Sequence, residues 1–250
     1  MPDLRPITQQ LSAPPRDFRT THWSVVLAAG NHSENAQVAL EKLCHAYWYP
    51  IYGFVRWRGY DEHQSKDLTQ EFFARLLSGD SLQSVSPERG KFRTFLLAAM
   101  KNFLANDWRD SQRLKRGGGK EFLSWDNLDA EQRFTHEPAE ETSAESWFDR
   151  RWAQALVSSA LKRLGDEMER DGVKQRFDVL KVFLQGDGGE ISYADAAQLV
   201  GLSEPATKTA IFRLRRRYGE LIREEVAATV GDSGDVEAEI QHLIQVLASV

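Results

Sequence analysis

Cysteine is almost absent from this chain of 250 residues, since Cys44 is the single one. One cysteine excludes an internal disulfide and a cysteine-based metal site, and it is typical of proteins from a reducing cytoplasm. Long apolar runs are missing too, because no stretch approaches the roughly 20 apolar residues of a membrane span. Residues 1–20 also lack the positive start and the apolar run of a signal peptide. We therefore expect a cytoplasmic protein that does not contact a membrane.

Signals for catalysis are also missing. The six histidines show no metal-ligand spacing, and the three glycines at 117–119 lack the strand and helix that surround a phosphate-binding loop. The sequence therefore predicts a protein that is not an enzyme and that needs no metal or other cofactor.

The net charge of −5 is distributed very unevenly along the chain. Residues 91–120 hold eight Lys or Arg against two acids, and residues 191–223 hold six against three. Each basic block is followed by an acidic one: residues 121–149 have nine acids and one arginine, and residues 224–250 have six acids and no Lys or Arg. This segregation predicts two surfaces that face nucleic acid, with solvated acidic segments after each.

The segment 191–223 has the pattern of a helix-turn-helix. Ser192 can cap a short helix, with Asp195 three residues on, and Gly201 favours the left-handed end of that helix. Ser203 can then cap a second helix with Pro205 in its first turn. Its buried stripe is predicted to be Ala206, Ala210, Ile211, Leu214, Tyr218, Leu221 and Ile222. Its other faces carry Thr207, Lys208, Thr209, Phe212, Arg213, Arg215, Arg216 and Arg217. The second helix is therefore expected to lie against DNA; the alternative is a solvated basic helix in a helical bundle.

The first half of the chain also reads as helices. We expect a short helix near residues 23–30 and an aromatic-rich one from Ala36 to Trp57, kinked or broken at Pro50 and Gly53. Residues 61–77 predict a loop followed by an amphipathic helix with an acidic side, and residues 92–116 predict a helix with an apolar stripe and a basic end. That end mixes cations, amides and an aromatic ring, which can hold phosphates and stack on an unpaired base: Lys101, Asn102, Asn106, Trp108, Arg109, Arg113, Lys115 and Arg116.

The predicted fold is all-α, with two helical domains joined by an acidic linker. We expect a mobile arm over residues 1–20, a first domain over 21–116, and a linker without helical periodicity over 117–149. A second domain with the helix-turn-helix follows over 150–228, and an amphipathic helix lies in 229–250. The apolar face of that last helix needs a partner.

The order of these motifs resembles that of bacterial sigma factors of the extracytoplasmic-function group, in the sigma-70 family. The run Asp67-Leu68-Thr69-Gln70-Glu71-Phe72-Phe73-Ala74-Arg75-Leu76 is similar to region 2.2, which docks on the largest subunit of core RNA polymerase. The run from Phe92-Arg93-Thr94-Phe95-Leu96 through Asn102 to Trp108 is similar to regions 2.3 and 2.4, and residues 192–217 are similar to region 4.2. The likeness covers residues 21–228 and implies binding to core RNA polymerase and to promoter DNA.

The resemblance assigns three sets of contacts. Binding to core RNA polymerase falls to Asp67, Gln70, Glu71, Phe72 and Arg75. Contacts with the −10 element fall to Lys101, Asn102, Asn106, Trp108, Arg109 and Arg113, with Asn102 at the place of base capture. Contacts with the −35 element fall to Thr207, Lys208, Thr209, Phe212, Arg213 and Arg216. The acidic linker would either mimic nucleic acid in a polymerase channel or act as a solvated tether.

One departure from the family suggests a form of regulation. Ser65 and Lys66 stand where many members have further acids, and some members with such a deficit depend on phosphorylation of a threonine by a serine/threonine kinase. Thr69 is the candidate here, since a phosphate would add about −1.5 to −2 charges beside Asp67 and Glu71. The simpler interpretation makes Thr69 an ordinary helix residue without a regulatory role.

A different class of function stays open. A DNA-binding regulator that never engages core RNA polymerase would use the helix-turn-helix alone. The 67–77 helix and the basic-aromatic helix would then have no explanation.

Overall fold

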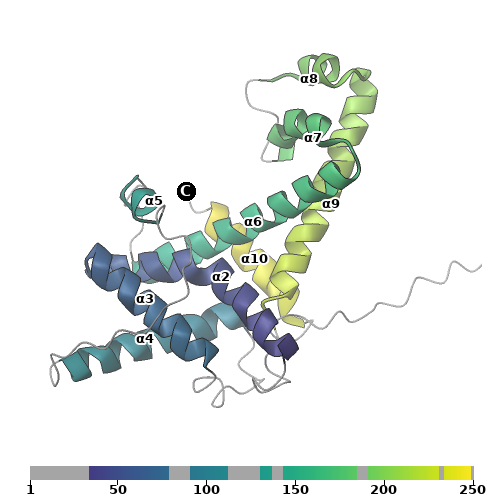
Figure 1. Cartoon of the computed structure of the whole chain (residues 1–250). Helices are drawn as coiled ribbons and strands as arrows, with labels where there is room; N and C mark the ends of the chain where they lie inside the picture. Colours follow the sequence, from purple (N-terminus) through teal and green to yellow (C-terminus); the bar gives the residue numbers. More distant parts are fainter. Residues whose placement is uncertain are drawn as a thin grey trace, which may run out of the picture.

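In the computed structural model, the residues described are 34–78, 91–111, 130–136, 143–184, 191–230 and 234–248. They fold into helices, and within these ranges no strand forms (Figure 1), which confirms the all-α prediction. The elements are α2 (Glu34–Trp57), α3 (Glu62–Leu77), α4 (Phe92–Ser111), α5 (Ala130–His136), α6 (Ala144–Arg170), α7 (Lys174–Leu180), the 3₁₀ helix η2 (Lys181–Leu184), α8 (Tyr193–Val200), α9 (Glu204–Ala227) and α10 (Gly234–Ala248). The predicted arm and the predicted helix near 23–30 lie outside the described residues.

Helix α2 is the centre of the first half of the molecule, where it packs against α3 and α6. The aromatics Tyr47, Tyr52 and Phe54 are fully buried in the hydrophobic core, whereas Trp57 at the end of the helix is exposed. Of the two expected alternatives, a kink or a break, the break is wrong, because α2 runs uninterrupted through Pro50 and Gly53. The ring of Trp147 in α6 explains Gly53: a Cβ at that position would lie 1.7 Å from Cη2 of Trp147.

The predicted acidic linker contains helical structure, so the expectation of no helix in 117–149 is wrong in two places. Helix α5 lies inside the segment, and Ala130 at its start is buried in the same hydrophobic core as α2. Helix α6 begins at Ala144, capped by Ser143, and passes through the expected boundary at 149/150 without a break. Its first turns bury Trp147, Phe148 and Trp152 against the first half of the chain, because these large apolar side chains lie on one face.

The helix-turn-helix forms at the far end of α6 and α9 from α2 (Figure 1). Ser192 accepts from the backbone N–H of Asp195, Gly201 ends α8 in the left-handed conformation at φ 67°, and Ser203 accepts from Ala206 N–H at the start of α9. Two small apolar clusters support it, one with Phe177 and Tyr218 and one with Phe183 and Ile211. The local signals in the sequence thus located α8, its turn and the start of α9 correctly. The predicted buried stripe of α9 is wrong at Ala206, which is exposed, because the stripe begins one residue later, at Thr207.

Helix α10 finds the partner that its apolar face requires within the chain itself. It packs on α6 and α9, and Leu243 is buried in the core cluster that also contains residues of α2, α3 and α4. Just before it, Lys91 and Val230 form an isolated antiparallel bridge. The end of the chain is therefore part of the fold of the first half.

Candidate nucleic-acid interface

Helix α3 presents part of the predicted polymerase-binding set to solvent. Asp67 and Arg75 are exposed, and Gln70 and Glu71 are partly exposed. Arg75 forms an ion pair with Glu71 one turn earlier and lies 5.1 Å from the ring centroid of Phe103. The Arg75–Glu71 pair is neutral as a whole. No described cation pairs with Asp67, so its carboxylate gives this face of α3 its negative charge.

Two members of that helix do not lie where the prediction needs them. Phe72 is only 4% exposed and packs against Phe73 and Phe103, so it supports α4 and does not present its ring to a partner. Thr69 is 0% exposed, and its hydroxyl has no hydrogen-bond partner in the structure. Thr69 is therefore not on the surface beside Asp67 and Glu71, because the apolar stripe of α3 is wide enough to include it.

Helix α4 carries the predicted −10 contacts on its second half. Asn102 and Asn106 are exposed and, being four residues apart, lie on one face. Lys101 forms an ion pair of 2.7 Å with Glu145 at the start of α6. The hydrogen bond from Lys101 lowers the pKa of the Glu145 carboxyl, despite an opposing effect of burial. The side chains of Trp108 and Arg109, and all of Arg113, lie outside the described part of the chain.

Helix α9 exposes a continuous face near its start. Lys208, Thr209, Phe212, Arg213 and Arg216 are all exposed, at the spacing of neighbouring turns. Phe212 is 67% exposed, which is unusual for a large apolar ring and makes it available for an apolar contact with a base. Lys208 pairs with Glu204 at 2.6 Å and lies 5.4 Å from the ring centroid of Tyr193, so α8 steadies it.

The same helix corrects the predicted DNA-binding set. Thr207 is 0% exposed and its hydroxyl has no hydrogen-bond partner in the structure, so it is a packing residue and not a −35 contact. Two of the four neighbouring arginines are structural: Arg215 donates to the carbonyl of Phe183 at 2.9 Å, and Arg217 donates to both oxygens of Glu167 at 2.7 and 2.9 Å. Of the four arginines, these pairings leave Arg213 and Arg216 as the exposed ones that do not hold α9 to another helix. Arg216 forms an ion pair with Glu220 of the same helix at 3.3 Å.

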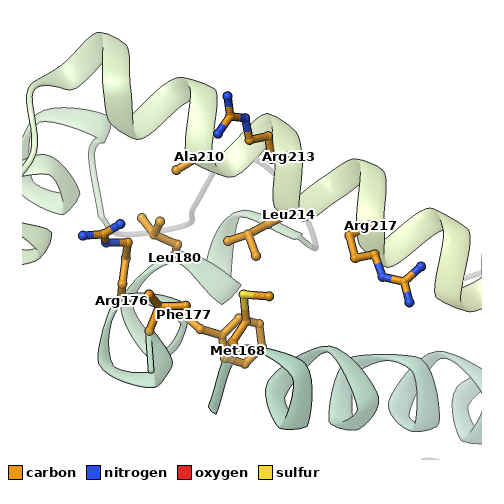
Figure 2. Close-up of a pocket in the computed structure, with 9 residues that line it drawn as sticks. Met168, Arg176, Phe177, Leu180, Ala210, Arg213, Leu214 and Arg217 are labelled. Atoms are coloured by element: carbon orange, nitrogen blue, oxygen red, sulfur yellow. The ribbon is translucent and has the colours of Figure 1, made fainter. Parts of the chain in front are cut away.

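An apolar pocket of about 270 Å³ lies beneath this part of α9, between it and the α6–α7 turn (Figure 2). Phe177, Leu180 and Leu214 line its interior, and Arg176, Arg213 and Arg217 stand around it. The pocket is open to solvent on one side, so part of the apolar surface below α9 is not covered by the protein.

The sequence analysis missed a buried acidic residue that joins distant helices. Glu239 of α10 is 0% exposed and forms ion pairs with Lys91, at 2.8 Å, and with Arg93. The signal was present: Glu239 falls on the apolar stripe of its helix, between Val236 and Leu243, where a charge without a buried partner would be costly.

Comparison with known proteins bears on the first half of the chain. Residues 44–114 match the family model described as Sigma-70 region 2, which covers much of α2 and all of α3 and α4. The match supports a sigma factor of the sigma-70 family, a class of non-enzymatic transcription initiation factors that act with core RNA polymerase at promoters. The helix-turn-helix lies outside the matched residues. No curated protein and no solved structure matches the chain.

Two searches of the described residues found nothing further. No helix among them is both long enough and apolar enough to cross a membrane. No group of three or more His, Cys, Asp or Glu side chains in the same ranges could hold a metal ion.

Proposed function

We propose that this chain is an alternative sigma factor of the extracytoplasmic-function type, which binds core RNA polymerase and directs initiation at its own promoters. The observation that carries the proposal is the combination of a Sigma-70 region 2 match on α2–α4 with a separate helix-turn-helix whose second helix exposes a basic and aromatic face. A factor of this kind works in the cytoplasm, where the polymerase is.

The division of labour follows the exposed residues. Helix α3 contacts core RNA polymerase through Asp67, Gln70, Glu71 and Arg75, and its buried Phe72 holds that surface against α4. Helix α4 reads the −10 element with Asn102 and Asn106, with Lys101, Trp108, Arg109 and Arg113 at the phosphates and bases. Helix α9 reads the −35 element with Lys208, Thr209, Phe212 and Arg213, and Arg216 holds a phosphate.

A copurification experiment tests the proposal. The double change Asp67→Lys and Glu71→Lys should abolish copurification with core RNA polymerase, because both carboxylates lie on the outer side of α3. A matched control is Asp166→Lys with Glu169→Lys, which reverses two exposed acids on α6 at a similar spacing. Equal binding by the α3 variant and the wild type would contradict the assignment of this face.

The alternative function, a regulator that never engages core RNA polymerase, is separated by the same experiment. A wild-type chain that binds promoter DNA and never copurifies with core RNA polymerase would favour the regulator. The exposed acidic face of α3 would then have no role, which is why we prefer the sigma factor.

Phosphorylation of Thr69 by a serine/threonine kinase requires a conformational change in α3 first. Because the hydroxyl is buried, a kinase can reach it only after this part of α3 turns or lifts away from the bundle. Thr69→Val tests the idea more sharply than Thr69→Ala, since it removes the hydroxyl and leaves no cavity. Promoter activity equal to wild type under inducing conditions would place control elsewhere.

A further inference from the structure

The apolar pocket beneath α9 has no role in the proposed function. Its volume of about 270 Å³ compares with about 150 Å³ for a cavity that holds one benzene molecule. In proportion, the pocket has room for an apolar body of about ten carbon atoms. Phe177, Leu180 and Leu214 belong to its wall, and among the described residues that line it none is acidic. Such a wall suits the hydrocarbon part of a small ligand.

Two arginines at the edge of this pocket are available to an anion. Arg176 of α7 and Arg213 of α9 are exposed, and within the described part of the chain neither side chain has a hydrogen bond or an ion pair. Their guanidinium groups lie at the edge and not over the apolar interior (Figure 2). Arg217 differs, because it donates to both carboxylate oxygens of Glu167. The edge thus offers two uncompensated positive charges from two helices.

The edge and the wall together define the chemistry of the ligand. A guanidinium group binds a carboxylate through two parallel hydrogen bonds, so a carboxylate is the head group that fits the edge. The wall carries the non-aromatic side chains of Met168, Val173, Leu180 and Leu214 against the single ring of Phe177. Methionine adapts its shape to what it contacts, and an acyl chain is flexible too. A linear carboxylic acid of about ten carbon atoms therefore matches both parts of the pocket.

Arg213 stands between this pocket and the face of α9 that we propose to contact DNA. Phe212, one residue earlier, is exposed on that face, and Leu214, one residue later, lines the pocket. Each lies about 100° around the helix from Arg213, at about 3.6 residues per turn. A guanidinium group that pairs with a carboxylate at the pocket is not available to a DNA phosphate, and the bound carboxylate repels the duplex.

We propose that this pocket binds a medium-chain fatty acid. The carboxylate pairs with Arg176 and Arg213, and the chain lies against Phe177 and Leu214. The bound acid withdraws Arg213 from promoter DNA and so lowers the affinity of α9 for the −35 element. Binding of the acid stands on the pocket alone, whereas its effect on DNA rests on the proposed function.

Titration calorimetry of the full chain with sodium decanoate tests the binding. We expect one site with a Kd on the order of 0.1 mM, which is ordinary for a ligand of about 12 non-hydrogen atoms. 1-Decanol has the same chain without the charge and should bind at least about tenfold more weakly. Circular dichroism at the same concentrations checks that the helices stay folded.

A substitution that fills the pocket tests where the acid binds. Ala210 lines the pocket, so Ala210→Leu should lower the affinity for decanoate at least about tenfold by occupying the space of the chain. Ala206→Leu is the matched control, because Ala206 is exposed one turn earlier on α9 and does not line the pocket.

A second substitution tests the head group and also serves if circular dichroism shows that Ala210→Leu is unfolded. Arg176→Gln removes an exposed charge at the edge and should lower the affinity for decanoate about tenfold. Arg170→Gln is its control, because Arg170 is an exposed arginine of α6 that does not line the pocket.

A DNA-binding assay tests the effect of the acid. Decanoate at a saturating concentration should weaken binding of the wild type to a cognate −35 duplex at least about threefold. Sodium acetate at the same concentration controls for ionic strength. Ala210→Leu should lose this response to decanoate, and Ala206→Leu should keep it.

The outcomes separate this inference from the function on which its second part rests. Calorimetry involves neither DNA nor core RNA polymerase, so a wild type that does not bind decanoate would overturn the inference and leave the sigma-factor proposal standing. Failure of the wild type to copurify with core RNA polymerase would contradict the sigma-factor proposal and leave the calorimetry to decide the pocket. Decanoate binding with unchanged affinity for DNA would overturn the coupling between the two.

Three further results would assign the pocket differently and so overturn the proposal. Wild-type affinity for decanoate in Ala210→Leu and Arg176→Gln would mean that the acid binds elsewhere. Tighter binding of a naphthalene carboxylate than of decanoate would assign the pocket to aromatic acids. A dimer in sedimentation experiments that Ala210→Leu dissociates would assign it to a second copy of the chain.

Discussion

The two helices that we propose to read promoter DNA rest on very different supports. Helix α4 stands on one large core that includes residues of α2, α3, α6 and α10, with aromatic pairs such as Tyr47–Phe92 at 5.0 Å. The first half of α9 stands on two small clusters, with ion pairs such as Arg217–Glu167 at its side and an open apolar pocket beneath it. The comparison teaches that α4 should be hard to shift, whereas the start of α9 should adjust more easily.

The largest expected effect concerns the packing of α6 on α2. Gly53→Ala should destabilise the fold by about 3 kcal/mol, since its Cβ would overlap the ring of Trp147. Gly219→Ala in α9 is the control, because no atom lies within 4 Å of a Cβ there, and it should stabilise by about 0.5–1 kcal/mol. Urea unfolding measures both. A neutral Gly53→Ala would mean that α6 does not pack on α2 as described.

The next effect concerns DNA binding and not stability. Phe212→Ala should cost about 1–3 kcal/mol of discrimination at the −35 element, because the exposed ring contributes to no hydrophobic core. Binding to cognate and scrambled −35 sequences, measured at one salt concentration, checks it. An equal loss on both sequences would contradict base reading by Phe212.

Two neighbouring arginines sharpen the contrast within α9. Arg217→Ala should lower stability by about 1 kcal/mol, a modest value because its ion pairs are partly exposed to solvent. Arg213→Ala should leave stability unchanged and reduce the salt dependence of DNA binding by about one phosphate contact. Thermal unfolding and salt titrations measure the two properties; the reverse pattern would exchange their roles.

The smallest effects come from the two buried threonines. Thr69→Val and Thr207→Val should each change stability by no more than about 1 kcal/mol and tend to increase it, because both hydroxyls are buried without a hydrogen-bond partner. Thr207→Val should also keep full −35 binding. A loss of DNA binding in a stable Thr207→Val would restore the original assignment of Thr207 as a contact.

The sequence predicted the elements better than the roles of single side chains. Caps and the left-handed Gly201 are local signals, so they located α8 and α9 correctly. Whether Thr69 and Thr207 face inward depends on neighbouring helices, which helical spacing alone does not reveal. The same limit applies to Arg217, whose partner Glu167 lies 50 residues earlier, and to the packing of α6 across the expected linker.

Transcription in a purified system tests the central claim most directly. Core RNA polymerase with this chain should produce transcripts from a discrete start site downstream of a cognate promoter. That product should disappear when the chain is omitted or when Asp67 and Glu71 are changed to Lys. Specific DNA binding by the chain together with no transcript above the level of core RNA polymerase alone would contradict the sigma-factor assignment.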